Sequence, residues 1–111
     1  MKNTIKLTSF LLILALSGLA QAAESGWTNS SQVKKIAVTA AGGINVYLLP
    51  ELSGCDSQSG YGEHYASILP GHPGLNLMLS NLLAAKTTKT PVQLYLFDDK
   101  CTAVEMILHD G

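Results

Sequence analysis

The chain has 111 residues, with seven lysines, no arginine, eight acidic residues and a formal net charge of −1. This length suits one small domain. A slightly acidic chain without arginine lacks the basic surface that attracts nucleic acids and anionic membranes, so the composition argues against both as partners.

Residues 1–22 are predicted to form a secretory signal peptide. Lys2 and Lys6 precede an apolar run over 7–20, and Ala20 and Ala22 supply the small residues that a signal peptidase requires. The alternative is a membrane anchor, but the run is shorter than the roughly 20 residues that cross a bilayer, and no second such run follows. Cleavage after Ala22 would leave no membrane span and would place the protein in the periplasm or outside the cell.

Cys55 and Cys101 are the two cysteines of the chain. Because an exported protein meets an oxidising environment, we predict a disulfide between them. The alternative is a reactive thiol or a metal thiolate, which no C-x-x-C spacing supports. Closing a loop of about 46 residues would stabilise the fold by roughly 4 kcal/mol on the chain-entropy model.

The first predicted elements are a polar lead-in and a hairpin. Residues 23–32 are polar apart from Trp27, which we expect to cover an edge of the core. Alternating apolar residues then predict strands near 33–40 and 44–49, and the Gly-Gly pair between them is typical of a hairpin turn. A proline follows the second strand and cannot donate to a ladder.

The middle of the chain changes from strand to helix. A turn-rich segment leads to a short predicted strand over 63–69, and four breaker residues over 70–74 end it. Apolar residues then recur at helical spacing over about 74–86, where Leu77 points away from the main stripe. The stripe consists of Leu75, Met78, Leu79, Leu82 and Leu83.

Two alternating runs close the chain and complete a β-β-β-α-β-β order. Val92, Leu94 and Leu96 alternate with the residues between them, and the run over 103–109 alternates in the same way. This mostly β order with one helix and one disulfide predicts a single OB-fold-like domain over 33–111, a five-stranded Greek-key barrel whose helix lies between the third and fourth strands. An α+β sandwich with the same element order is the alternative.

Glu63, His64 and His72 are the candidates for a metal-binding or catalytic set. Neighbouring residues of a strand point to opposite faces, so Glu63 and His64 diverge, and no close-spaced histidine pair is present. No G-x-S-x-G motif and no phosphate-binding glycine loop occur. The sequence therefore predicts no enzyme activity, no metal and no cofactor.

Tyrosines are the more promising candidates. Tyr47 lies out of phase with the buried positions of its strand, and Tyr61 and Tyr65 flank the predicted third strand. An exposed tyrosine offers a flat apolar face with a hydroxyl, which suits stacking on a sugar or packing against a protein. We predict Tyr47, Tyr61 and Tyr65 as ligand-binding residues.

The stretch 82–101, L-L-A-A-K-T-T-K-T-P-V-Q-L-Y-L-F-D-D-K-C, resembles small secreted OB-fold proteins related to the B subunits of subtilase cytotoxin and pertussis toxin. The matching features are a helix end at Leu82–Ala85, a strand at Val92–Leu96 and the cysteine pair. The resemblance covers 33–109 in element order. It implies a non-catalytic module that binds glycan or protein and assembles into a homo-oligomeric ring carrying an enzymatic subunit.

Two functions of different classes follow from these patterns. The first is a secreted or periplasmic binding module with a glycan or protein ligand at the tyrosines. The second is a structural or inhibitory periplasmic protein that docks on one envelope enzyme.

Overall fold

The structure is a computed structural model that describes residues 21–22 and 25–110. Most of the predicted signal peptide therefore lies outside the described residues. The described part of the chain is mostly β, and none of its helices has the length and apolar character that a bilayer crossing needs. The elements in chain order are β1 (Gln21–Ala22), β2 (Gly26–Trp27), β3 (Gln32–Val38), β4 (Ile44–Leu49), β5 (Leu52–Ser53), the 3-10 helix η1 (Gln58–Gly60), β6 (Tyr65–Ile68), α2 (Leu75–Thr88), β7 (Val92–Leu96) and β8 (Ala103–Leu108).

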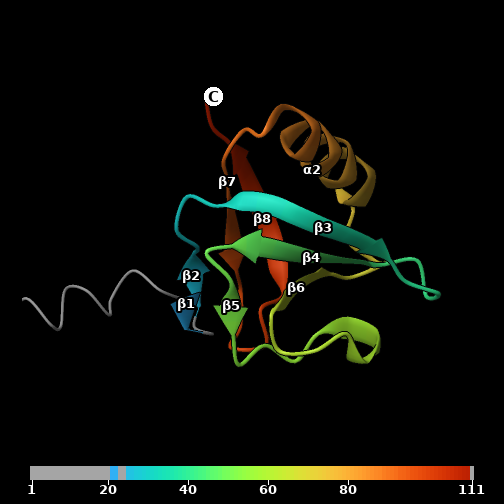
Figure 1. The fold of residues 1–111 in the computed structure, drawn as a ribbon. Coiled ribbons are helices and arrows are strands. Elements are labelled where there is room, and N and C mark those ends of the chain that lie inside the picture. The colour runs from blue at the N-terminus through green and yellow to red at the C-terminus, as the bar shows by residue number, and fades with distance from the viewer. Residues whose placement is uncertain (1–20, 23–24, 111) are drawn as a thin grey trace, which may run out of the picture.

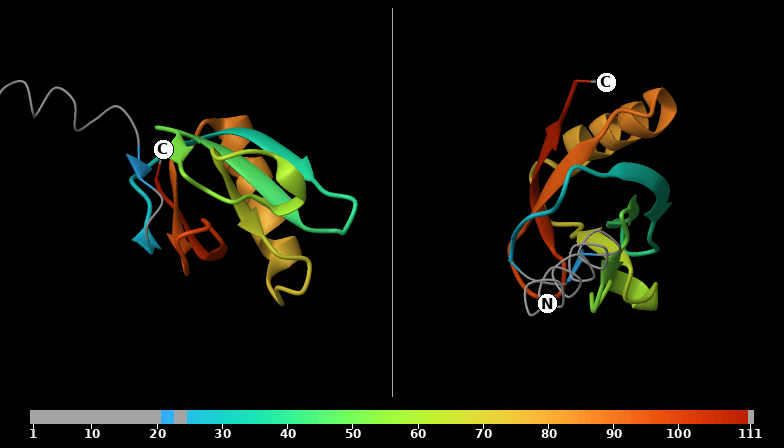
Figure 2. Two further views of the ribbon diagram at one scale, coloured as in Figure 1. Left: turned by 90° about the horizontal axis from the view of Figure 1, so that it is seen from below. Right: turned by 60° about the vertical axis from the view of Figure 1, so that its left-hand side comes forward.

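Two three-stranded antiparallel sheets form the body of the molecule (Figure 1). One has the order β3-β4-β6 and the other β2-β7-β8, and β1 forms a separate parallel pair with β5. The strands of one sheet run across those of the other (Figure 1), and α2 packs against β3 and β8 at one end of both sheets (Figure 2). The sheets and the helix thus enclose one shared interior.

The predicted five-stranded barrel is not closed. The edges of the two sheets meet at two isolated bridges, an antiparallel one between Ser31 and Val92 and a parallel one between Ser67 and Thr102. Within the described ranges no continuous ladder joins the sheets. The reason lies partly in β6, which has four residues and is followed by the breaker segment 70–74, so it is too short to pair along the length of β8.

The predicted lead-in takes part in the fold from residue 26 onward. Strand β2 pairs with β7, and Leu94 N–H donates to Thr28 Oγ1 at 3.0 Å while Thr28 N–H donates to the Leu94 carbonyl at 2.8 Å. The ring of Trp27 meets that of Tyr95 edge-on, with 5.2 Å between ring centroids, and 43% of Trp27 is exposed. Trp27 therefore covers the outside of β7, rather than an edge of the core as the sequence suggested.

The hairpin between β3 and β4 forms as predicted. Thr39 N–H donates to the Gly43 carbonyl at 2.8 Å, and Gly42 N–H donates to the Thr39 carbonyl at 2.9 Å. Gly42 has a φ of +92°, a backbone conformation that favours glycine. The turn sets a register in which Ile44, Val46 and Leu48 all point into the core.

Helix α2 confirms the predicted element but buries a narrower stripe than the sequence indicated. Met78, Leu82 and Ala85 are buried, whereas Leu83 is 49% exposed and Leu77 is 73% exposed. The helix ends two residues later than predicted, at Thr88. Lys89 then adopts a left-handed conformation, and its N–H donates to the carbonyl of Ala85.

The core combines buried apolar residues from both sheets with those of α2. Strand β7 buries every second residue, as its alternation predicts, but β8 is less regular. A register irregularity at Tyr95 and Leu96 leaves Val104 without a partner in β7, so Ala103 pairs with Leu96 and is fully buried. Leu108 pairs with the buried Val92 but is 43% exposed at the end of the strand. The largest fully buried side chains from the apolar set are Ile44, Leu48, Leu52, Ile68, Leu82, Leu94, Leu96, Val46 and Val92.

The predicted disulfide is present. Cys55 and Cys101 are bonded across a Cα–Cα distance of 5.3 Å, and both residues are buried. The bond joins the loop that follows β5 to the residues just before β8. Backbone hydrogen bonds from Cys55 N–H to the Glu63 carbonyl and from Ser67 N–H to the Cys101 carbonyl lie beside it.

Replacing Leu82 with alanine should destabilise the protein by about 2–5 kcal/mol, because the side chain is fully buried between the helix and the sheets. The matched control Leu77→Ala removes the same atoms from a side chain that is 73% exposed, and should change the stability by less than about 0.5 kcal/mol. Urea denaturation followed by circular dichroism measures both values. Equal effects would show that α2 packs with a different face.

Candidate ligand-binding site

The three tyrosines selected from the sequence lie together on the outer face of the β3-β4-β6 sheet. Strand pairing places Lys35 of β3 opposite Tyr47 of β4, and Tyr47 opposite Tyr65 of β6. These positions alternate with the core positions of β4, so their side chains point away from the interior. We call Tyr47, Tyr65 and Tyr61 the tyrosine row.

The rings of the tyrosine row touch one another edge to face. The centroids of Tyr47 and Tyr65 are 5.4 Å apart, and those of Tyr61 and Tyr65 are 5.7 Å apart. Tyr61 comes from the loop after η1 and is 43% exposed, while the other two are half-buried. Such contacts favour one arrangement of the three rings and leave aromatic surface open to solvent.

Polar side chains surround the row at its Tyr47 end. The Tyr47 hydroxyl donates to Glu51 Oε2 at 2.5 Å, and the Lys35 ammonium lies 5.5 Å from the centre of the Tyr47 ring. The His64 ring stands edge-on to Tyr47 with 6.2 Å between centroids. The site therefore combines apolar ring surface with a cation, a carboxylate and an imidazole.

The hydrogen bond to Glu51 raises the pKa of the Tyr47 phenol, because ionisation would break the bond and place a second negative charge beside the carboxylate. Burial and the charge of Glu51 act in the same direction, with a smaller effect from Tyr65. Tyr47 consequently stays a neutral hydrogen-bond donor throughout the physiological pH range. Because the hydroxyl hydrogen of Tyr47 is used in the bond to Glu51, the ring surface is the part of Tyr47 that can pack against a ligand.

His64 is fixed by a backbone carbonyl. Its Nδ1 lies 2.6 Å from the Leu52 carbonyl oxygen, which accepts only, so Nδ1 carries the proton. Its Nε2 lies 3.6 Å from Glu63 Oε1. The bond to Leu52 is the largest cause that raises the pKa of His64, followed by the negative charges of Glu51 and Glu63, while burial opposes them.

A buried polar network holds the Tyr61 loop against the sheet. Asn45, fully buried on β4, donates through Nδ2 to the Gln58 carbonyl at 2.7 Å and accepts at Oδ1 from Ser67 Oγ at 2.6 Å. Gln58 N–H donates in turn to Ser67 Oγ at 2.8 Å. A Cβ on Gly43 would collide with the side-chain amide of Gln58, so the hairpin also touches this loop. The network covers the neighbouring part of the face that carries the tyrosine row.

Sequence reasoning missed this network. The available signal was Asn45, a single polar residue inside the apolar run of β4 at an outward position. A polar side chain at such a position either faces solvent or forms hydrogen bonds with a segment that covers it. In the structure, the segment around Gln58 covers Asn45 and bonds to it.

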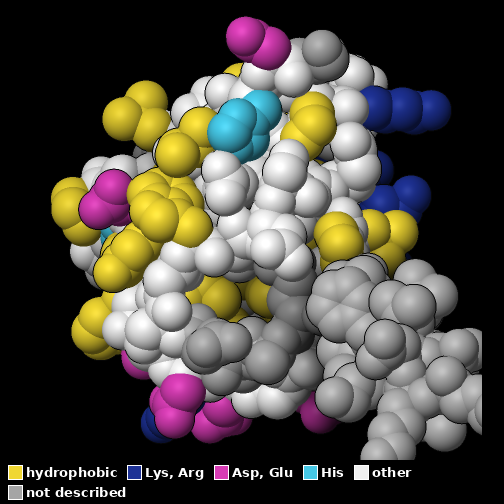
Figure 3. All heavy atoms as spheres, turned by 90° about the vertical axis from the view of Figure 1, so that its left-hand side faces the viewer, with side chains coloured by type: hydrophobic (Ala, Val, Ile, Leu, Met, Phe, Trp, Pro, Cys, Tyr) yellow, Lys and Arg dark blue, Asp and Glu magenta, His cyan; other side chains and the backbone are white. Residues whose placement is uncertain are grey.

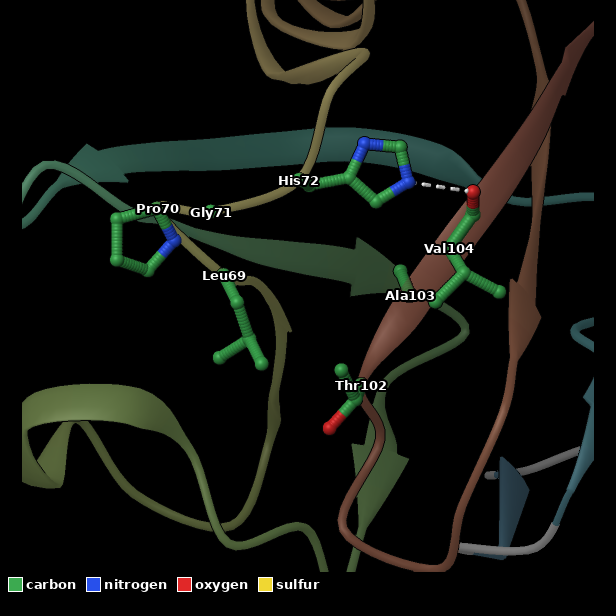
Figure 4. Close-up of a pocket in the computed structure, with 7 residues that line it drawn as sticks. All are labelled: Leu69, Pro70, Gly71, His72, Thr102, Ala103 and Val104. Carbon is green, nitrogen blue, oxygen red and sulfur yellow. Dashed lines mark hydrogen bonds between the residues drawn. The ribbon is translucent and has the colours of Figure 1, made fainter.

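The candidate metal or catalytic residues Glu63, His64 and His72 do not all come together in the structure. His64 lies at the tyrosine row, whereas His72 donates from Nε2 to the Val104 carbonyl at 2.8 Å and accepts at Nδ1 from Gly74 N–H at 2.9 Å. His72 thus ties the 70–74 turn to β8 through Nε2 and braces the turn itself through Nδ1, beside an apolar hollow of about 420 Å³ (Figure 4). No group of three or more histidine, cysteine or acidic residues that could hold a metal occurs among residues 21–22 and 25–110.

Because the folded state raises the pKa of His64 above its usual value near 6.5, protonated His64 stabilises the fold below that value, and the stabilisation is lost as the pH rises through the raised pKa. An NMR titration of the His64 ring should give a pKa above the usual one. In Glu63→Gln the pKa should fall slightly yet stay raised, because the Leu52 carbonyl remains. A pKa at or below the usual value in the wild type would contradict this account.

The geometry describes a surface that can bind and orient a ligand, with polar groups at its rim. The chain was compared with models of protein families, with curated proteins and with solved structures. None of the three comparisons gives a match.

Proposed function

We propose that the chain is a secreted or periplasmic non-catalytic binding module whose tyrosine row binds glycan. The observation that carries the proposal is the meeting of Tyr47, Tyr65 and Tyr61 on one outer face, with Lys35, Glu51 and His64 beside them. This combination supplies apolar ring surface for the C–H face of a sugar and polar groups for its hydroxyls.

The order of strand neighbours supports an OB-like module. Starting from β6, the neighbours run β4, β3, β7 and β8, and the Ser67–Thr102 bridge leads from β8 back to β6. Three of these five neighbour relations are strand ladders and two are single bridges, so the order is OB-like although the sheets do not close into a barrel. The resemblance to toxin B subunits over 82–101 points to the same architecture, and with it to a homo-oligomer, whose mass light scattering on the mature protein would measure.

The polar groups around the row fit a neutral or weakly charged sugar. Glu51 accepts one hydrogen bond from Tyr47, and a carboxylate has about four acceptor positions in all. Lys35 supplies donors, and the edge-to-face packing holds the rings before any ligand arrives. Preorganised rings of this kind lose little conformational entropy when they bind.

Replacing Tyr61 with alanine should weaken glycan binding about tenfold or more, because its ring is exposed and packs on Tyr65 without entering the core. A glycan array with the oxidised mature protein identifies the ligand, and calorimetry gives the affinity. Phe97→Ala is the matched control, since Phe97 is an aromatic residue that is 60% exposed but belongs to neither the core nor the row.

An array without hits, or an equal loss of affinity in both variants, would contradict glycan binding at the tyrosine row. Retained far-ultraviolet circular dichroism in each variant separates a loss of binding from a loss of fold.

A second candidate function, docking on a protein partner, is favoured by the outer face of the other sheet. Strand pairing places Trp27 opposite Tyr95, and Ile107 of β8 lies on the same face. Trp27 is 43% and Ile107 is 40% exposed. Figure 3 views the molecule from this side and shows hydrophobic side chains gathered beside acidic ones. Aromatic residues of this kind anchor protein interfaces.

Docking through this patch predicts that one stoichiometric protein is crosslinked from an envelope extract by the wild type and by Leu77→Ala, but not by Trp27→Ala. Leu77 is the control because it is a large apolar residue, 73% exposed, on a different element. Crosslinking that is unchanged by Trp27→Ala would exclude the patch as the docking surface.

A further inference from the structure

A second hollow, distinct from the tyrosine row, lies where the start of β3, the end of β4 and the end of α2 meet. Its volume is about 480 Å³. Its lining residues are Gln32, Val33, Lys34, Leu49, Lys86 and Lys89. We call it the lysine groove. Within the part of the chain that the structure describes, the charged side chains that line it are the three lysines.

A β-bulge brings the first of these lysines to the groove. The pairing of β3 with β4 shifts between Val33 and Lys35, so Lys34 is an extra residue without a partner in β4. Lys35 resumes the pairing and stands over Tyr47, while Lys34 lines the groove. Two consecutive lysines thereby serve two different surfaces.

The other two lysines come from the last turn of α2 and its cap. Lysines there commonly satisfy free carbonyls at the helix end. Here the Ala85 carbonyl, the first of the four at the helix end, accepts instead from the backbone N–H groups of Lys89 and Thr90. That carbonyl therefore does not need a lysine ammonium group.

None of the three ammonium groups has an ion-pair or hydrogen-bond partner among the described residues. The one ion pair found there joins His64 and Glu63. Like charges gathered around one hollow repel each other, and a bound anion would relieve that repulsion. Figure 3 shows lysine side chains together at one edge of the molecule, with no acidic side chain between them.

We propose that the lysine groove binds the phosphate group of a ligand that also has an apolar part. A lysine ammonium is a compact point charge that binds phosphate without the planar geometry that arginine demands. Val33 forms buried apolar lining, and Leu49, 41% exposed, offers an apolar contact beside the charges. The net negative charge of the whole chain does not oppose this, because the field at the groove is set by the three nearby lysines.

Calorimetry with inorganic pyrophosphate in buffer of low ionic strength tests the groove directly. Vesicles of phosphatidylcholine with and without phosphatidic acid test for a lipid source of the same phosphate chemistry. In Lys86→Ala the dissociation constant should rise about fivefold, corresponding to about 1 kcal/mol for one lysine near an anionic group. The triple variant Lys34→Ala/Lys86→Ala/Lys89→Ala should lose binding. Lys100→Ala, an exposed lysine in the turn before β8, is the control and should bind as the wild type does.

Binding of pyrophosphate alone would assign a soluble phosphate ligand, and binding that requires phosphatidic acid vesicles would assign a lipid. Either result supports the proposal if the triple variant, checked for its fold by circular dichroism, loses it. Absence of wild-type binding to both probes, or an equal loss in Lys100→Ala and Lys86→Ala, would overturn it. The tyrosine row is tested separately, because Tyr61→Ala leaves all three lysines in place.

Discussion

The attachment of the 55–64 loop to the outer face of the β3-β4-β6 sheet is the constraint on which the candidate site depends. The hydrogen bonds of Asn45, Ser67 and Gln58 hold the loop on the sheet, and the Cys55–Cys101 disulfide ties the start of the loop to the residues just before β8. A loop of this composition would otherwise keep much of its conformational freedom. Because the loop is fixed at both its start and its middle, Tyr61 is held beside Tyr65 although Tyr61 does not belong to a strand.

The tyrosine row and the lysine groove illustrate how one short strand can serve two surfaces. Regular pairing of β3 would point every second residue to the same side of the sheet. The bulge at Lys34 interrupts this alternation, so Lys34 and Lys35 are both exposed while Val33 stays in the core. Four of the seven lysines thus lie at these two surfaces, Lys35 at the tyrosine row and the other three at the lysine groove.

Much of the fold was predictable because it rests on local patterns. The Gly-Gly turn and the helical spacing from Leu75 to Leu82 each depend on residues that are close together in the sequence. The disulfide was predictable because the chain has only two cysteines. The closure of the sheets was not predictable, because it depends on how far β6 extends and on bridges such as Ser67–Thr102 between distant segments. The sequence marked Tyr61 and Tyr65 as candidates, but the contact between their rings depends on how the 55–64 loop folds back on the sheet. The place of His64 beside them depends on the Leu52 carbonyl, which no side-chain pattern records.

The two glycines of the β3–β4 hairpin look equivalent in the sequence, yet the structure needs them for different reasons. Gly42 is required for its torsion angle, with φ at +92°, and has open space around it apart from one ordinary contact with Pro70. Gly43 has no such angle, but a Cβ there would meet the end of the Gln58 side chain, which would have to move. A side chain at position 42 is therefore opposed by the backbone conformation, whereas one at position 43 would displace the Gln58 amide from its bond to Thr39. The tip of the hairpin is thus in contact with the loop that carries Tyr61.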